Sequence, residues 1–307
     1  MPSHTKEVKL RLQSINNTRK ITKAMELVSA AKMRKATEAA LLTRNYHSLA
    51  WGIVDRLINS QLWFDSISPV KRFFETEENI NHTSIVAFTS NRGLCGAFNT
   101  NIVKTILPYV EKHGKKNVSI ITIGNRGTVA MTSLGLNVEF AHKKDDAAKD
   151  DASVLEIADV LYKKFSEKKT DKVMVAYSDY KSAISQEPVL KQLFPFEKEP
   201  QVGREEDEAS RPGEKNMEAP KTLEYLYEPN KYDLLEYLIP RIAQVQLYQA
   251  LLESNASEHS ARMVAMKSAS DAAKEMADDL VLVFNKARQS GITQEIAEIS
   301  AGRAAVS

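Results

Sequence analysis

The fold is decided by the stretch from Leu238 to Ala287, which reads LIPRIAQVQLYQALLESNASEHSARMVAMKSASDAAKEMADDLVLVFNKA. Counting forward from Leu238 in alternating steps of four and three gives a series in which only Gln249, His259 and Ser270 are not apolar. Apolar residues repeated in this way over about seven heptads are typical of a left-handed coiled coil. The series is Leu238, Ile242, Val245, Gln249, Leu252, Ala256, His259, Met263, Met266, Ser270, Ala273, Ala277, Leu280, Phe284 and Ala287.

No glycine or proline interrupts the chain from Arg241 to Ser290, which favours one continuous helix. A helix from Arg241 to about Arg303 would be about 95 Å long at 1.5 Å per residue. We expect Pro240 in the first turn of this helix or at a kink. Small residues on the seam allow a partner helix to approach closely: Ala256, Ala273, Ala277 and Ala287.

The N-terminal segment supplies the predicted partner helix. Between Ser3 and Ile67 the only glycine or proline is Gly52, and a helix from Lys6 to Asn59 would be about 80 Å long. The two helices should run antiparallel, because the middle of the chain has to connect them. Apolar residues in steps of three and four, interrupted at Lys32 and Lys35, predict the stripe that faces the partner: Ile21, Met25, Val28, Ala39, Leu42, Tyr46, Leu49, Ile53 and Leu57.

The middle of the chain alternates between short β-branched runs and helical stretches. Such alternation indicates βαβ units and a largely parallel sheet. The run 180–196 is interpreted as a loop or hairpin, and the acidic segment 197–218 as a surface excursion. The predicted strands are 83–89, 118–124, 138–141, 172–177 and a last one at 222–228, and the predicted helices are 99–112, 126–134 and 153–168.

These elements predict an α+β chain: a long antiparallel coiled coil of N- and C-terminal helices plus a central α/β, Rossmann-like domain. The predicted boundaries are 1–60 for the first coiled-coil helix, 61–230 for the α/β domain and 231–307 for the second helix. The 307 residues suffice for this arrangement. We expect no membrane-spanning segment and no leader peptide.

Charge is balanced over the whole chain, at a net +2, but the N-terminal helix is basic. Up to Arg44 it carries ten lysines and arginines against three glutamates. Three interpretations stay open: a nucleic-acid contact, a contact with an acidic protein surface, and a solvated helix face.

The glycine-containing stretch from Ser90 to Asn99, SNRGLCGAFN, lies between a predicted strand and a predicted helix. Phosphates bind at such turns in α/β folds. The spacing fits neither of the common phosphate-binding motifs, which favours a tight turn that needs glycine dihedral angles. The same holds for the glycines at 124 and 127.

Catalytic patterns are missing from the sequence. The six histidines show no metal-ligand spacing, and the single cysteine, Cys95, has no histidine near it in sequence, which favours a structural thiol. We therefore expect no metal and no cofactor. An enzyme with helical arms would need a phosphate loop and catalytic side chains. A free-standing or DNA-binding coiled coil would leave the small residues of the seam unexplained.

Four stretches together resemble the γ subunit of F-type ATP synthase in order, spacing and location. The resemblance covers essentially the whole chain, with departures at Asn16, Asn91 and Arg303, where the family usually has Lys, Asp and Ala. The four stretches are ITKAMELVSAAKMRK (21–35), SNRGLCGAFN (90–99), QLYQALLESNASEHSARMVAMK (246–267) and LVFNKARQSGITQEIAE (282–298).

The resemblance implies a non-catalytic rotor shaft inside a ring of three α and three β subunits, with the α/β domain as a foot on the ε subunit and the membrane c-ring. It implies no nucleic-acid partner and a peripheral place on the cytoplasmic face of a bacterial inner membrane. By position, Met25, Arg288 and Gln289 match residues that contact the β subunit. Arg262, Thr293 and Glu295 match residues tied to coupling efficiency.

Overall fold

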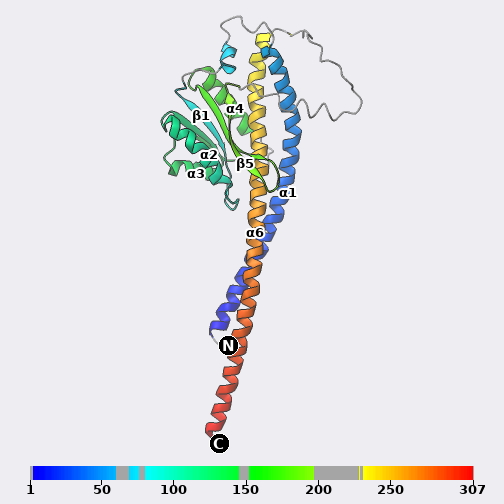
Figure 1. Ribbon diagram of the computed structural model, residues 1–307, viewed down its shortest axis with the longest axis vertical. Coiled ribbons are helices and arrows are strands. Elements are labelled where there is room, and N and C mark those ends of the chain that lie inside the picture. The colour runs from blue at the N-terminus through cyan, green and yellow to red at the C-terminus, as the bar shows by residue number, and fades with distance from the viewer. Residues whose placement is uncertain are drawn as a thin grey trace, which may run out of the picture.

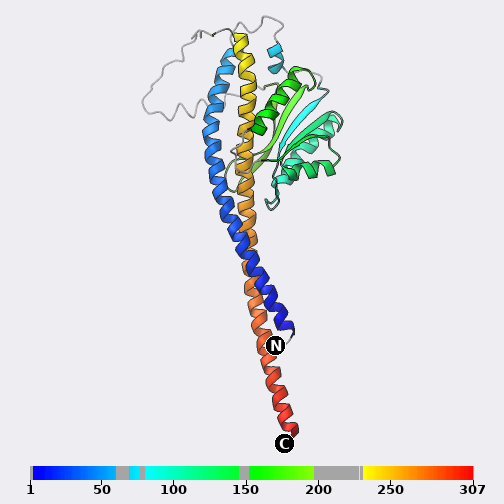
Figure 2. The ribbon, with the colours of Figure 1, turned by 180° about the vertical axis from the view of Figure 1, so that it is seen from behind.

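Two long antiparallel helices form the axis of the molecule in the computed structural model, which describes residues 3–59, 69–75, 80–144, 152–196, 228 and 231–306. Helix α1 (Ser3–Asn59) lies beside helix α6 (Lys231–Val306), and a sheet domain packs against one side of the pair (Figures 1 and 2). The C-terminal end of α6 extends past the N-terminus of α1 as a single helix (Figure 1). The predicted antiparallel coiled coil is confirmed.

The predicted seam of α6 is confirmed along its length, since each of its fifteen positions is buried or half-buried. The helix begins earlier than predicted, at Lys231, so that Pro240 lies inside α6 and not in its first turn. Leu235 and Ile239, which precede the proline, are almost fully buried in the core of the α/β domain. Their burial stabilises the additional turns despite the missing backbone donor.

The predicted stripe of α1 is wrong at most of its described positions, since only Met25 and Ala39 are half-buried. The side chains of Tyr46 and Leu57 lie outside the described residues. Ile21 is 60% exposed and Leu42 is 76% exposed, and Val28, Leu49 and Ile53 are exposed too. The residues of α1 that are buried in their place include Ser29, Ala36 and Ala40. The true seam is shifted by one residue, which is about 100° around the helix.

The seam of α1 mixes small and large residues. Ser29, Ala36 and Ala40 are buried where α1 faces the turns of α6 from Gln249 onward. The Ser29 hydroxyl donates to the Met25 carbonyl oxygen within its own helix (2.7 Å). Nearer the N-terminus Val8 is buried, and Leu12 and Ile15 are half-buried.

The sheet domain has five strands in the order β3-β2-β1-β4-β5. The first four are parallel and β5 pairs antiparallel with β4, so the run 180–196 is one arm of a hairpin. The strands are β1 (Thr83–Phe88), β2 (Val118–Ile123), β3 (Val138–His142), β4 (Lys172–Tyr180) and β5 (Gln186–Phe194). The remaining elements are η2 (Pro69–Phe73), α2 (Phe98–His113), α3 (Asn125–Ser133) and α4 (Ala152–Ser166).

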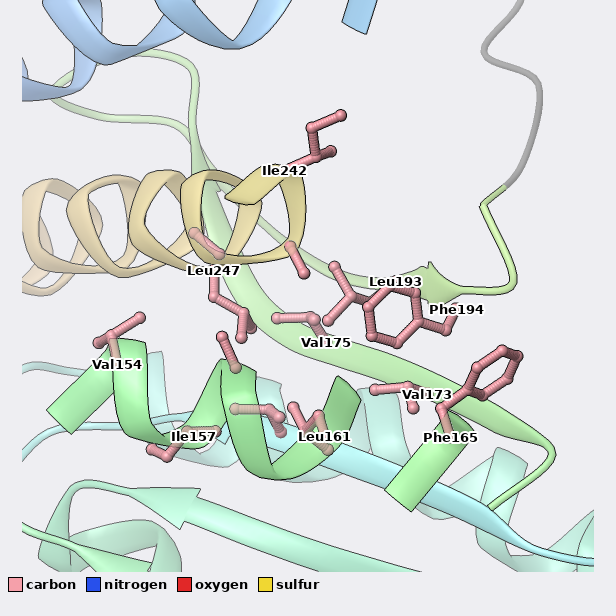
Figure 3. Packing of buried hydrophobic residues seen from close by; sticks show 14 of the residues in the cluster. Val154, Ile157, Leu161, Phe165, Val173, Val175, Leu193, Phe194, Ile242 and Leu247 are labelled. Carbon is pink, nitrogen blue, oxygen red and sulfur yellow. The ribbon is translucent and has the colours of Figure 1, made fainter. Parts of the chain in front are cut away.

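Helix α6 is at once half of the coiled coil and a covering layer of the sheet. Alternation along β1 sends Ile85 and Ala87 to the face covered by α2, and Val86 and Phe88 to the opposite face. On that opposite face Leu247 of α6 packs together with side chains from α4, β4 and β5 (Figure 3), and Ile242 belongs to the same buried cluster. The domain is therefore attached to the shaft through its own hydrophobic core.

Two predictions fall outside the described residues. The segment 197–218 is one, and the predicted strand at 222–228 is the other except for Glu228.

Candidate functional site

Ten consecutive residues of α6, Leu251 to Ser260, are all buried. A surface helix buries a single stripe, so a fully buried run means that other parts of the chain surround the helix here. Helix α1 lies on one side of this run, and the sheet domain on the other (Figures 1 and 2). This run is the junction between the α/β domain and the coiled coil.

The β4–β5 hairpin is bound to one side of the junction. The Ser257 hydroxyl donates to the Ser178 carbonyl oxygen (2.9 Å), and the Ser260 hydroxyl donates to the carbonyl oxygen of Ala183. The Gln186 amide donates to the Ser260 oxygen (3.2 Å). The hydroxyls of Ser257 and Ser260 thus bind backbone carbonyl oxygens at two points of the hairpin.

The loops after β1 and β3 are bound to the junction by charges. The Glu258 carboxylate accepts from Lys144 Nζ (2.8 Å) at one oxygen and from Arg262 Nη2 (2.9 Å) at the other. The Lys144 side chain is fully buried and that of Glu258 is 3% exposed. Arg262 Nη2 also donates to the Arg92 carbonyl oxygen (3.3 Å).

Asn91 joins the two loops to each other. Its amide donates to the Lys144 carbonyl oxygen (2.5 Å), and its side-chain oxygen accepts from the Lys144 backbone N–H (3.1 Å). An aspartate, the residue usual in the family resembled, has no donor for the first of these bonds. The asparagine at this position therefore adds one bond between the loops.

Electrostatics at the junction keep Glu258 charged and His259 neutral. Burial by itself raises the pKa of Glu258, but Lys144 and Arg262 outweigh burial and hold this pKa below its usual value. Burial lowers the pKa of the neighbouring His259 to about 4. The Glu258 carboxylate opposes this shift, and Lys144, Arg262 and Lys32 act in the same direction as burial. At neutral pH the junction thus contains a carboxylate between two cations, beside an uncharged imidazole.

The loop from Ser90 to Asn99 is a tight turn. Leu94 and Gly96 have positive φ angles of 64° and 56°. The Ser90 backbone N–H donates to the Asn99 side chain (2.9 Å), and Cys95 is buried beneath the turn. These contacts agree with the sequence-based interpretation of a conformational turn and a structural thiol.

An open pocket of about 670 Å³ lies at the carboxyl ends of β1, β2 and β3, lined by residues that include Arg92, Asn125 and Lys143. The first backbone donors of α3 are already bonded, because Arg126 N–H donates to the Ser90 carbonyl oxygen and Gly127 N–H donates to the Thr89 hydroxyl. The helix start that would cradle a phosphate is therefore occupied by the protein itself.

The six candidate residues fall into two groups, and the first consists of Met25 and Arg262. A hydrogen bond from Gln249 Nε2 to the Ala40 carbonyl oxygen (3.3 Å) fixes the antiparallel register. In an antiparallel pair, Met25, which is fifteen residues before Ala40, lies opposite Val264, which is fifteen residues after Gln249. Half-buried Met25 is therefore at nearly the same level as Arg262.

The second group lies about 40 Å further along α6, where α1 has ended (Figure 1). It consists of Arg288, Gln289, Thr293 and Glu295, all of them exposed. The Thr293 hydroxyl donates to the Gln289 carbonyl oxygen (3.0 Å) within the helix. The structure thus does not bring the six residues together.

Sequence reasoning assigned no role to Lys144, Glu258 and Ser257, and it singled out Asn91 only as a departure from the family resembled. The i, i+4 spacing of Glu258 and Arg262 on a predicted helix was the one signal available. Nothing local in the sequence pairs Glu258 with Lys144, which is 114 residues away.

Each lysine and arginine of α1 whose side chain is described is exposed. None of the described helices is long and apolar enough to cross a membrane. The described part of the chain contains no group of three or more His, Cys, Asp or Glu side chains placed to hold a metal ion.

Comparison with known proteins relates the chain to one family over its whole length. The family model described as ATP synthase matches residues 4–306. The ATP synthase gamma chain of Histophilus somni is 35% identical over 305 residues, covering 98% of this chain and 99% of the relative. That of Herpetosiphon aurantiacus is 36% identical over 308 residues, covering 98% of each.

Among solved structures, a chain of the mitochondrial ATP synthase of Euglena gracilis, in a structure described as OSCP/F1/c-ring, has a TM-score of 0.65 at 20% identity and covers 100% of this chain and 95% of its own. At this identity the likeness shows the fold. The family match and the identities above 30% over nearly full length show more: the chain belongs to the ATP synthase gamma-chain family.

Proposed function

We propose that this chain is the central rotor shaft of an ATP synthase and couples proton flow through the membrane c-ring to conformational cycling of three catalytic β subunits. The observation that carries the proposal is the single-helix end of α6, where Arg288, Gln289, Thr293 and Glu295 are exposed beyond the end of α1. A helix that presents different side chains around its circumference can contact three identical neighbours in three different ways. Differential contact of this kind biases each neighbour toward a different state.

The parts of the chain take different roles in this proposal. Residues 1–60 and 231–307 form the shaft within the α3β3 ring, and residues 61–230 form the foot on ε and the c-ring. The chain binds no cofactor and catalyses no reaction itself, and it acts as a subunit of the enzyme complex. It lies on the cytoplasmic face of a bacterial inner membrane as a peripheral protein, without a nucleic-acid partner, so the basic face of α1 meets acidic protein surfaces of the ring.

The six candidate residues divide by level. Met25 and Arg262 act at the level of the junction. Arg288 and Gln289 bond a β-subunit loop at the far end of the shaft, where the planar guanidinium fork suits a carboxylate. Thr293 and Glu295, one to two turns further on, contribute to coupling in the same region.

Co-purification with α and β subunits tests the assignment as a rotor. A chain that purifies alone and hydrolyses ATP would favour an enzyme, and retention on DNA without α and β would favour a DNA-binding coiled coil. Within the assembled complex, Met25→Lys introduces a cation at a half-buried apolar contact. We expect ATP hydrolysis to persist while ATP-driven proton pumping falls.

Met25→Leu is the matched control, because it keeps an apolar side chain of similar volume. It should retain both activities. Parallel loss of hydrolysis, pumping and assembled complex in Met25→Lys would mean that this residue serves assembly and would contradict its proposed role in coupling.

A further inference from the structure

The junction contains a closed circuit of polar contacts. Glu258 on α6 binds Lys144 and Arg262, and Arg262 binds the carbonyl oxygens of Arg92 and Gly93. Asn91, the residue before Arg92, binds the backbone of Lys144 in both directions and so closes the circuit. Two loops of the α/β domain are thereby connected to one turn of the shaft.

This arrangement is unusual as a source of stability. Lys144 and Glu258 are buried almost completely, and a buried ion pair is often no more stabilising than apolar side chains of the same volume. Such a pair does fix one geometry. The two oxygens of Glu258 can each accept from their own cation only when α6 and the domain are in this register.

A second set of hydrogen bonds joins the same turns of α6 to the β4–β5 hairpin. Ser257 and Ser260 bind the β4–β5 hairpin, while Glu258 and Arg262 bind the loops after β1 and β3. Side chains at 257, 258, 260 and 262 are spread around the helix at about 100° per residue. Rotation of α6 relative to the domain would break both sets of bonds.

We propose that Lys144 and Glu258 are positioning residues that lock Arg262 and the loop at Asn91–Gly93 in one arrangement, so that the α/β domain and the coiled coil turn as one body. The inference rests on the proposed rotor function. Torque applied to the domain reaches the shaft without slippage because the polar circuit admits one register. Without the circuit, the apolar packing of α6 on the sheet would still hold the α/β domain on the coiled coil but would resist twisting less.

The test uses the assembled complex in vesicles and the ratio of ATP-driven proton pumping to ATP hydrolysis. The double variant Lys144→Met/Glu258→Leu removes both charges of the buried pair together, and Arg262 then keeps its bonds to the Arg92 and Gly93 carbonyl oxygens. We expect it to assemble with hydrolysis within about twofold of the wild type, while the pumping ratio falls at least about fivefold. A wild-type ratio in this variant would overturn the inference.

Lys164→Met/Glu139→Leu is the matched control, because that ion pair joins α4 to β3 and does not involve α6. It should keep the wild-type ratio. Should the junction variant not assemble, Asn91→Ala opens the same circuit at a half-buried position and should lower the ratio in the same direction. A wild-type ratio in Asn91→Ala would then refute the inference.

A wild-type chain that fails to assemble with α and β, or whose complex does not pump, would refute the rotor function itself. A wild-type complex that pumps, with junction variants that pump equally well per ATP, would refute only the role of the circuit.

Discussion

The buried histidine of the junction should make the stability of the chain depend on pH. Burial lowers the pKa of His259 to about 4, from a usual value of 6.5. Above pH 6.5 the imidazole is neutral in both the folded and the unfolded chain, and the stability is fully present. As the pH falls below 6.5 the unfolded chain binds a proton that the folded chain does not, so stability is lost until the pH passes about 4.

The size of the effect follows from the shift. At 1.36 kcal/mol per pKa unit, the whole window corresponds to about 3 kcal/mol, and lowering the pH from 7.5 to 5 should remove about 2 kcal/mol. Glu258 stays charged over this range, because its pKa lies below the usual value.

Urea unfolding at pH 7.5 and at pH 5, followed by circular dichroism, measures the loss of unfolding free energy. His259→Gln is the control, since glutamine is neutral at both pH values. The stability that this variant loses between the two pH values comes from all other titrating groups. The wild type should lose about 2 kcal/mol more than this variant. Equal losses in the two chains would refute the reasoning, and so would an imidazole pKa near 6.5 in the folded chain, measured by NMR.

Three other changes test the packing and the proposed contact surface. Gly124→Ala would place a Cβ 2.3 Å from a backbone oxygen at a φ of 113°. It should lower the free energy of unfolding by more than about 1 kcal/mol, and by more than Gly114→Ala, where φ is also positive but the space is open. Ala256→Leu should overpack the seam and lower the stability by about 1–3 kcal/mol in thermal unfolding, unlike Ala272→Leu on the exposed face. Arg288→Ala should lower both ATP hydrolysis and proton pumping of the complex with an unchanged Tm, and wild-type rates would identify the residue as a solvated helix face.

The coiled coil was predictable because its signal is periodic and long. The seam of α6 repeats over about seven heptads, and no competing pattern on that helix has the same regularity. The seam of α1 was less predictable from large apolar residues, because its buried positions include Ser29, Ala36 and Ala40. Hydrophobicity identifies an interface poorly where small residues take buried positions while larger apolar residues, such as Ile21 and Leu42, stay exposed.

The junction was less predictable than the coil for a different reason. Glu258 and Ser257 flank a seam position, and in an isolated two-helix coil such flanking residues face solvent. They are buried because a third element, the sheet domain, covers this part of α6. That burial depends on contacts between segments far apart in the chain, which local sequence patterns do not encode.

Polar burial at the junction goes beyond what the circuit needs, and this bears on its role. Ser254 Oγ and Asn255 Nδ2 are buried without a hydrogen-bond partner among the described residues. Each buried polar atom without a partner lowers stability by about 1–3 kcal/mol. A junction that needed only to hold the two parts together would be more stable with apolar side chains, like the neighbouring contact of Leu247 with the sheet. Apolar surfaces tolerate repacking in alternative registers, whereas a carboxylate held by two cations tolerates one. A shaft that transmits rotation needs a single register more than it needs additional stability, and the residues around Glu258 supply that register.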